Sequence, residues 1–140
     1  MTVEFDYEQF RAVRLKKLRR YIRVLLTTAI IATLALILVE VVAYVDFEEG
    51  GFDARLALFT MWTISPYLFF AVLIPKQNPK ESRLTVYAIG ISIISFVALA
   101  VYFNGFILGL DASSGFLFLS VPFFQWIGTV CITFVSLLSK

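Results

Sequence analysis

The sequence has few of the residues on which enzyme chemistry usually depends. It contains no histidine, and so it lacks the commonest metal ligand and the usual general base near neutral pH. Its single cysteine, Cys131, excludes an internal disulfide and a cysteine-cluster metal site. No carboxylate pair shares an apolar segment, and no glycine-rich phosphate loop is present. We therefore expect a protein that is not an enzyme and that binds neither a metal ion nor a cofactor.

Charge is also scarce. Only 16% of the residues are charged, whereas 60% are hydrophobic, and the mean hydropathy is +0.88. A soluble domain of 140 residues with this composition would expose too much apolar surface to water. The composition therefore predicts an integral membrane protein whose outer surface is covered by the lipid bilayer.

Four apolar stretches are each long enough to cross the hydrocarbon core, which needs about 20 helical residues. They run over residues of about 24–45, 54–74, 84–103 and 115–138. We expect an all-α membrane protein. In this interpretation, residues 24–140 form an up-down-up-down bundle of four transmembrane helices, preceded by a basic amphipathic N-terminal helix over residues 1–23. The short connection at 75–78 predicts that the second and third spans are antiparallel neighbours.

The basic residues predict how the chain is oriented. Seven lysines and arginines lie between Arg11 and Arg23, three lie between Lys76 and Arg83, and Lys140 ends the chain. The connections at 46–53 and 104–114 contain none. Because cytoplasmic segments carry the excess of Lys and Arg, both termini are expected in the cytoplasm.

The basic block from Arg11 to Arg23 indicates contact with anionic lipid. Apolar residues at helical spacing accompany it, so this segment is suited to lie on the inner leaflet. Nucleic acid is not an expected partner, because a basic block beside a span is the ordinary topology signal of a membrane protein.

Three charged residues near the outer surface are candidate sites. Glu40 and Arg55 lie at the outer end of the first hairpin, where they form either a clip that fixes helix register or an ion or proton site. Asp111 lies in the turn before the fourth span. It either caps that turn or serves as an outward-facing binding carboxylate.

Two prolines inside spans predict local kinks. Pro66 falls near the middle of the second span, and Pro122 falls in the fourth. A bundle tolerates such prolines when another group bonds the carbonyl that each leaves without a partner. For Pro66, the nearest candidates are Ser65, Thr63 and a facing helix.

Gln125 is the deepest strongly polar side chain, and its amide needs partners in hydrocarbon. The candidates are a carbonyl freed by Pro122 or Pro66, and the hydroxyls of Ser92 and Ser95. Gln125 either bonds one helix to another or contacts a ligand or ion in a cavity beside a kinked backbone.

Aromatic and small residues also recur within the spans. Trp62, Tyr67, Tyr102 and Trp126 form either an aromatic pocket or packed rings in the bundle core. In the third span, one face carries mostly small residues at helical spacing, which permits close helix approach; these are Ala88, Ser92, Ser95, Leu99 and Tyr102.

One set of residues resembles uncharacterised small four-span membrane proteins of bacteria. It consists of Trp62-Thr-Ile-Ser-Pro66-Tyr67, then Tyr102, then Asp111-Ala112 followed by an apolar run to Pro122 and Gln125. The resemblance implies a multi-pass protein of the bacterial inner membrane and supplies no activity.

These observations favour a non-catalytic membrane protein that acts by protein or lipid contact. Such a protein would be an accessory, immunity, or defence or envelope component, with a membrane protein partner or a homo-oligomer. The alternative is a homo-oligomeric ion channel or small-solute carrier, in which Glu40 or Gln125 would face a shared axis. The directions in which Glu40 and Gln125 point distinguish these two functions.

Overall fold

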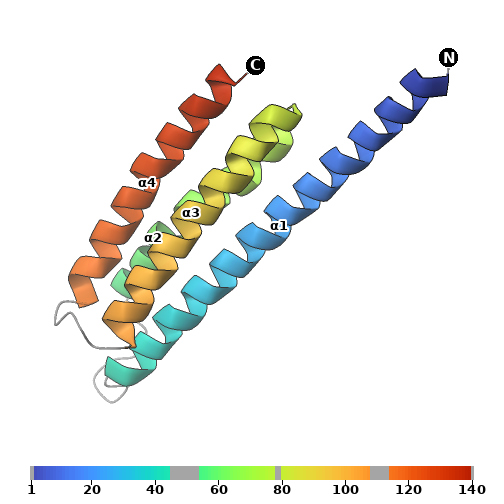
Figure 1. Cartoon of the computed structure of the whole chain (residues 1–140). Helices are drawn as coiled ribbons and strands as arrows, with labels where there is room; N and C mark the ends of the chain where they lie inside the picture. The colour runs from blue at the N-terminus through green and yellow to red at the C-terminus, as the bar shows by residue number, and fades with distance from the viewer. Residues whose placement is uncertain (1, 45–53, 78–79, 108–113, 140) are drawn as a thin grey trace.

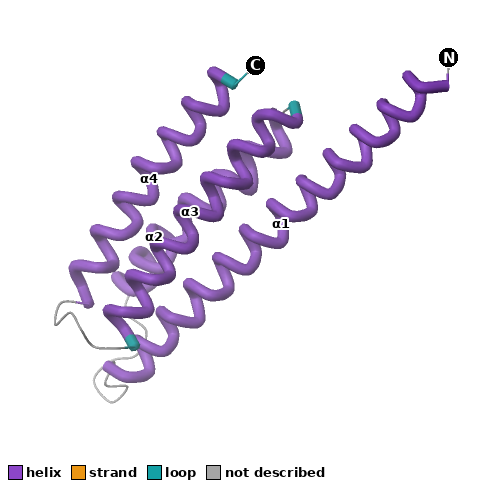
Figure 2. The backbone as a smooth tube through the Cα atoms, viewed as in Figure 1, coloured by secondary structure: helices purple, strands orange, loops and turns teal. Residues whose placement is uncertain are grey.

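The computed structural model describes residues 2–44, 54–77, 80–107 and 114–139, and within these ranges the regular structure is entirely helical (Figure 2). Four helices follow one another along the chain and lie side by side: α1 (Thr2–Tyr44), α2 (Ala54–Gln77), α3 (Glu81–Phe106) and α4 (Ser114–Leu138) (Figure 1). Each is long and apolar enough to cross a membrane. The four predicted spans therefore correspond to four helices.

Helix α1 is one continuous helix of 43 residues. At about 1.5 Å per residue it is roughly 65 Å long, about twice the thickness of a bilayer core of ~30 Å. The sequence predicts a break near residue 23, but the structure has none, because no glycine or proline interrupts Thr2–Tyr44. The basic segment is therefore the first part of the same helix that continues into the bundle (Figure 1).

Helix α2 extends farther than its predicted end at residue 74. It continues to Gln77 and holds both Pro66 and Pro75 inside it. Pro75 has no N–H to donate to the carbonyl of Ala71, one turn earlier. The helix still continues because a proline removes one bond of the ladder and leaves the flanking bonds in place.

The helices form a ring in the order α1, α3, α4 and α2, since these adjacent pairs make the extensive contacts among the described residues. Helices α2 and α3 therefore lie on a diagonal, and the prediction that they are neighbours is wrong. A short connection brings together only one end of each helix and does not fix the rest of their paths. Side chains still meet across the diagonal, where the rings of Phe70 and Tyr87 are 5.9 Å apart.

Helices α3 and α4 pack closely through two reciprocal glycine–isoleucine contacts. A Cβ atom on Gly90 would come within 2.5 Å of the Ile132 side chain, and one on Gly128 within 2.8 Å of Ile94. In each helix the glycine precedes the isoleucine by four residues, so one interface contains both contacts. Small residues of this kind let membrane helices approach without a hydrophobic driving force.

The small-residue face predicted for the third span serves a different purpose. Ala88, Ser95 and Tyr102 are buried, and Ser92 and Leu99 are half-buried. This face points into the bundle, whereas the closest approach to α4 uses Gly90. The sequence therefore predicts a small-residue face but not the position at which the helices come closest.

The buried residues form two apolar clusters separated by a polar layer. The first cluster includes Ile22, Leu26, Tyr67, Phe70, Leu84, Tyr87 and Ile91. The second contains Ile37, Ala98, Tyr102 and Val121. Along each helix, the polar layer falls between the levels of the two clusters, and it contains Thr33, Thr63, Ser95 and Gln125.

We expect the substitution Gly90→Ala to destabilise the protein by about 1–3 kcal/mol, because the new methyl group overlaps Ile132. Unfolding by sodium dodecyl sulfate in detergent micelles would measure this change. In an Ile132→Ala background, the same substitution should be almost neutral, since the overlapping atoms are absent. Equal losses in both backgrounds would contradict the proposed contact.

Candidate functional site: the polar layer of the bundle

A hydrogen bond between two buried side chains lies at the centre of the polar layer. The Gln125 amide nitrogen donates to the Tyr67 hydroxyl oxygen over 2.8 Å, which joins α4 to α2. Gln125 is 4% exposed and Tyr67 is 1% exposed. The bond is of the kind expected in one of the two alternatives for Gln125, a contact between helices, but its partner is Tyr67 and not one of the carbonyls or serines that the sequence suggests.

The other two helices also reach this bond. The hydroxyls of Thr33 in α1 and Ser95 in α3 lie beside the Tyr67 hydroxyl. Both are buried without a hydrogen-bond partner, so each is a close polar contact and not a hydrogen bond. All four helices thus converge on the Tyr67 hydroxyl.

Gln125 retains unused hydrogen-bonding capacity. Its carbonyl oxygen Oε1 is buried and has no hydrogen-bond partner. If the amide were turned over, its nitrogen would be the atom without a partner, because an amide has a donor end and an acceptor end. One buried polar atom of this side chain therefore lacks a hydrogen-bond partner in either orientation.

A groove between α3 and α4 runs alongside Gln125. Its volume is about 440 Å³, and Gln125 is among its lining residues. The other residues of the lining are apolar apart from Ser120, and they include Ile93, Val97 and Phe124. The Ser120 hydroxyl donates to the carbonyl of Phe116 in its own helix.

A second polar contact joins α2 to α4 beside Pro66. The Ser65 hydroxyl donates to the Trp62 carbonyl over 2.7 Å, and it accepts a hydrogen bond of 3.0 Å from the Trp126 indole nitrogen. Pro66 has no N–H to donate to the carbonyl of Trp62, one turn earlier. The prediction that Ser65 satisfies this carbonyl is confirmed, and the same hydroxyl also binds α4.

Buried threonines complete the polar layer, and of these only Thr63 is among the candidate residues that the sequence suggests. Thr63 donates to the carbonyl of Phe59, and Thr129 donates to the carbonyl of Gln125. Thr33 is also completely buried. The sequence indicates these threonines only by their positions, because each one interrupts a stripe of apolar residues that faces the inside of the bundle.

The remaining predicted site residues do not all meet. Glu40 lies in α1 and Arg55 in α2, but their side chains fall outside the described part of the structure, as does Asp111 entirely. Trp62 is 39% exposed on α2, whereas Tyr102 is fully buried in the second apolar cluster.

Two further predicted features have partners within the bundle. Trp126 packs against the Phe69 ring, with a centroid distance of 5.4 Å. Pro122 lies inside α4 and is buried.

Among the described residues, no group of three His, Cys, Asp or Glu side chains gathers to hold a metal ion. The hydroxyl and amide groups of the polar layer can donate and accept hydrogen bonds.

Replacing Tyr67 by phenylalanine should destabilise the bundle by about 1 kcal/mol, because the Gln125 amide loses its acceptor. The loss should be smaller in a Gln125→Leu background, where no amide needs that acceptor. Tyr21→Phe is the matched control. Its 3.3 Å contact with Ser92 is exposed, and we expect a change within about 0.5 kcal/mol. Equal losses for both tyrosines would argue against a special role for Tyr67.

Ser65→Ala should lower stability by about 1–2 kcal/mol, since it leaves both the Trp62 carbonyl and the Trp126 indole without their partner. Ser65→Thr should keep most of the stability, because a threonine hydroxyl can bond the same carbonyl. Thermal unfolding followed by tryptophan emission measures both. If threonine were as harmful as alanine, loss of these hydrogen bonds would not be the cause.

Comparison with known proteins gives no relative for this arrangement. No family model, no curated protein and no solved structure matches the chain.

Proposed function

We propose that this protein is a non-catalytic, multi-pass membrane protein that acts by holding another membrane protein. In this proposal it is an accessory, immunity, or defence or envelope component of a bacterial inner membrane. Its partner is an apolar transmembrane helix that lies in the groove between α3 and α4. That helix carries a hydroxyl or amide donor opposite Gln125.

The buried oxygen of Gln125, which has no hydrogen-bond partner, is the observation that carries this proposal. A buried amide oxygen without a partner is costly in hydrocarbon, because no water is present to bond it. A donor from a neighbouring helix would remove that cost and would also make the contact specific. The groove is lined mainly by apolar side chains, as the surface of a transmembrane helix requires.

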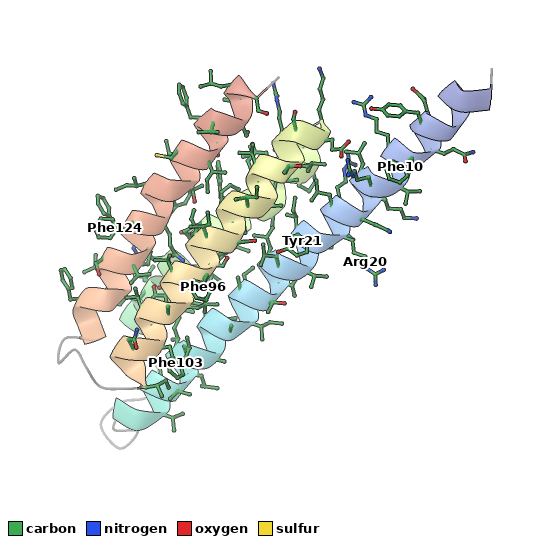
Figure 3. All side chains as sticks on the ribbon, in the orientation of Figure 1. Phe10, Arg20, Tyr21, Phe96, Phe103 and Phe124 are labelled. Atoms are coloured by element: carbon green, nitrogen blue, oxygen red, sulfur yellow. The ribbon has the colours of Figure 1, made fainter. Side chains whose placement is uncertain are left out.

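The direction of the Gln125 nitrogen favours contact over transport. It binds Tyr67 inside the bundle, whereas a channel or carrier would need its polar groups to line a shared aqueous path. The surfaces around the groove also suit lipid or a partner helix, since Phe116 and Phe124 are each 67% exposed. Figure 3 shows Phe124 pointing away from the other helices.

The arrangement of charges supports an up-down-up-down bundle with both termini in the cytoplasm. Arg14 of α1 pairs with Glu81 at the start of α3 over 3.2 Å. Arg83 donates to the carbonyl of Ser139 at the end of α4. Charged groups thus gather at one end of the bundle, where both chain termini lie (Figure 1). The positive-inside rule assigns that end to the cytoplasm.

Photocrosslinking in native membranes tests this proposal. A photoreactive phenylalanine at Phe124, which lines the groove, should form a discrete crosslink to one membrane protein. The same residue at Phe134 should not, because Phe134 is similarly exposed on α4 but does not line the groove. Val97→Trp fills the groove and should abolish the Phe124 crosslink, while Ile89→Trp, at another exposed position of α3, should preserve it.

Two results would contradict the proposal. Identical crosslinks from Phe124 and Phe134 would mean that the groove selects no partner. Crosslinks only to a second copy of this chain, together with ion conduction in planar bilayers, would instead support the homo-oligomeric channel or carrier.

A further inference from the structure

Two hydroxyl groups buried in the bundle depart from a pattern that the other buried hydroxyls follow. Five serines and threonines among the described residues are buried. Three of them, Thr63, Thr129 and Ser136, donate to a carbonyl three or four residues earlier in their own helix. The other two, Thr33 and Ser95, have no hydrogen-bond partner. Their hydroxyls are therefore not engaged by the backbone of their own helices.

Both exceptions lie beside the same atom, the hydroxyl oxygen of Tyr67. That oxygen already accepts a hydrogen bond from Gln125, and it has one proton to donate. A single proton cannot bond two oxygens at once, and the protons of Thr33 and Ser95 need acceptors of their own. A buried hydroxyl without a hydrogen bond is costly, and most of all inside a membrane. The three hydroxyls therefore require a further group between them.

The chemistry of these hydroxyls selects the group that fits. Each hydroxyl both donates and accepts hydrogen bonds, so a group that satisfies all three must do the same. An ion does not fit, because the buried polar side chains of the described residues include no charged one that would balance it. A water molecule is neutral and has two protons and two lone pairs. Buried waters typically make about three hydrogen bonds to polar groups that are otherwise unbonded.

We propose that the polar layer binds one water molecule, held by the hydroxyls of Tyr67, Thr33 and Ser95. The water joins α1, α2 and α3 at one point, and the bond between Gln125 and Tyr67 connects α4 to the same point. A hydrogen bond through water is nearly as favourable in enthalpy as a direct one. The water therefore turns two close polar contacts into a connected set of hydrogen bonds that includes every helix.

This site is separate from the groove in which the proposed partner helix lies. Thr33 and Ser95 are not among the residues that line the groove beside Gln125, and the water does not use the amide oxygen of Gln125. The inference goes beyond the proposed function. It depends only on how the four helices pack, so it holds whether or not a partner helix binds.

X-ray radiolysis of the full chain in lipid nanodiscs tests this site. Radiolysis converts water into hydroxyl radicals, which oxidise the side chains next to them, so a deeply buried side chain is oxidised rapidly only beside a bound water. Mass spectrometry of the peptides then gives the oxidation rate of each tyrosine. Tyr67 should be oxidised severalfold faster than Tyr87, although Tyr67 is 1% exposed and Tyr87 is 0% exposed.

Two double variants with the same chemical changes test which hydroxyls hold the water. Thr33→Val/Ser95→Ala removes two of the three hydroxyls and should lower the oxidation rate of Tyr67 to that of Tyr87. Thr133→Val/Ser136→Ala should leave the rate unchanged, because those two hydroxyls donate to carbonyls of their own helix. Circular dichroism and gel filtration show whether each variant is folded.

Equal oxidation rates of Tyr67 and Tyr87 in the wild type would overturn the proposal. So would an unchanged rate at Tyr67 in Thr33→Val/Ser95→Ala. The comparison of the two tyrosines uses the wild-type chain, so it decides the question even if that double variant does not fold.

Discussion

The hydroxyl group of Tyr67 is the point on which the rest of this bundle depends. Lipid does not drive helices together as water drives apolar surfaces together, so association depends on close packing and internal hydrogen bonds. The contact between Gln125 and Tyr67 supplies one such bond, with Thr33 and Ser95 close to the same oxygen. Because polar groups in hydrocarbon must find partners within the protein, this layer restricts how the helices can slide or rotate.

The two grooves give the outer surface two different chemistries. The groove between α3 and α4 is lined by apolar side chains apart from Gln125 and Ser120, which under the proposed function suits a partner helix that is mostly apolar and offers one donor. The groove between α1 and α2 has Arg19 and Arg23 in its lining.

The features that the sequence predicts well are local ones. Length and apolar composition identify each span independently, and Ser65 lies within one turn of the carbonyl that Pro66 leaves unbonded. The features that it misses depend on distant parts of the chain. The partner of Gln125 lies 58 residues away, and the fit between Gly90 and Ile132 depends on how two separate helices are aligned. The diagonal placement of α2 and α3 is likewise a property of the whole ring, which their short connection does not determine.

The unbroken length of α1 has a mechanical consequence. Residues from Thr2 onward belong to the same helix as Thr33 in the polar layer, and no glycine or proline between them can act as a hinge. Because α1 has no such hinge, a tilt of its basic N-terminal part also tilts the part that is buried in the bundle. A force applied to the exposed end, where Tyr7 and Phe10 are accessible, is therefore carried along α1 toward the level of Thr33.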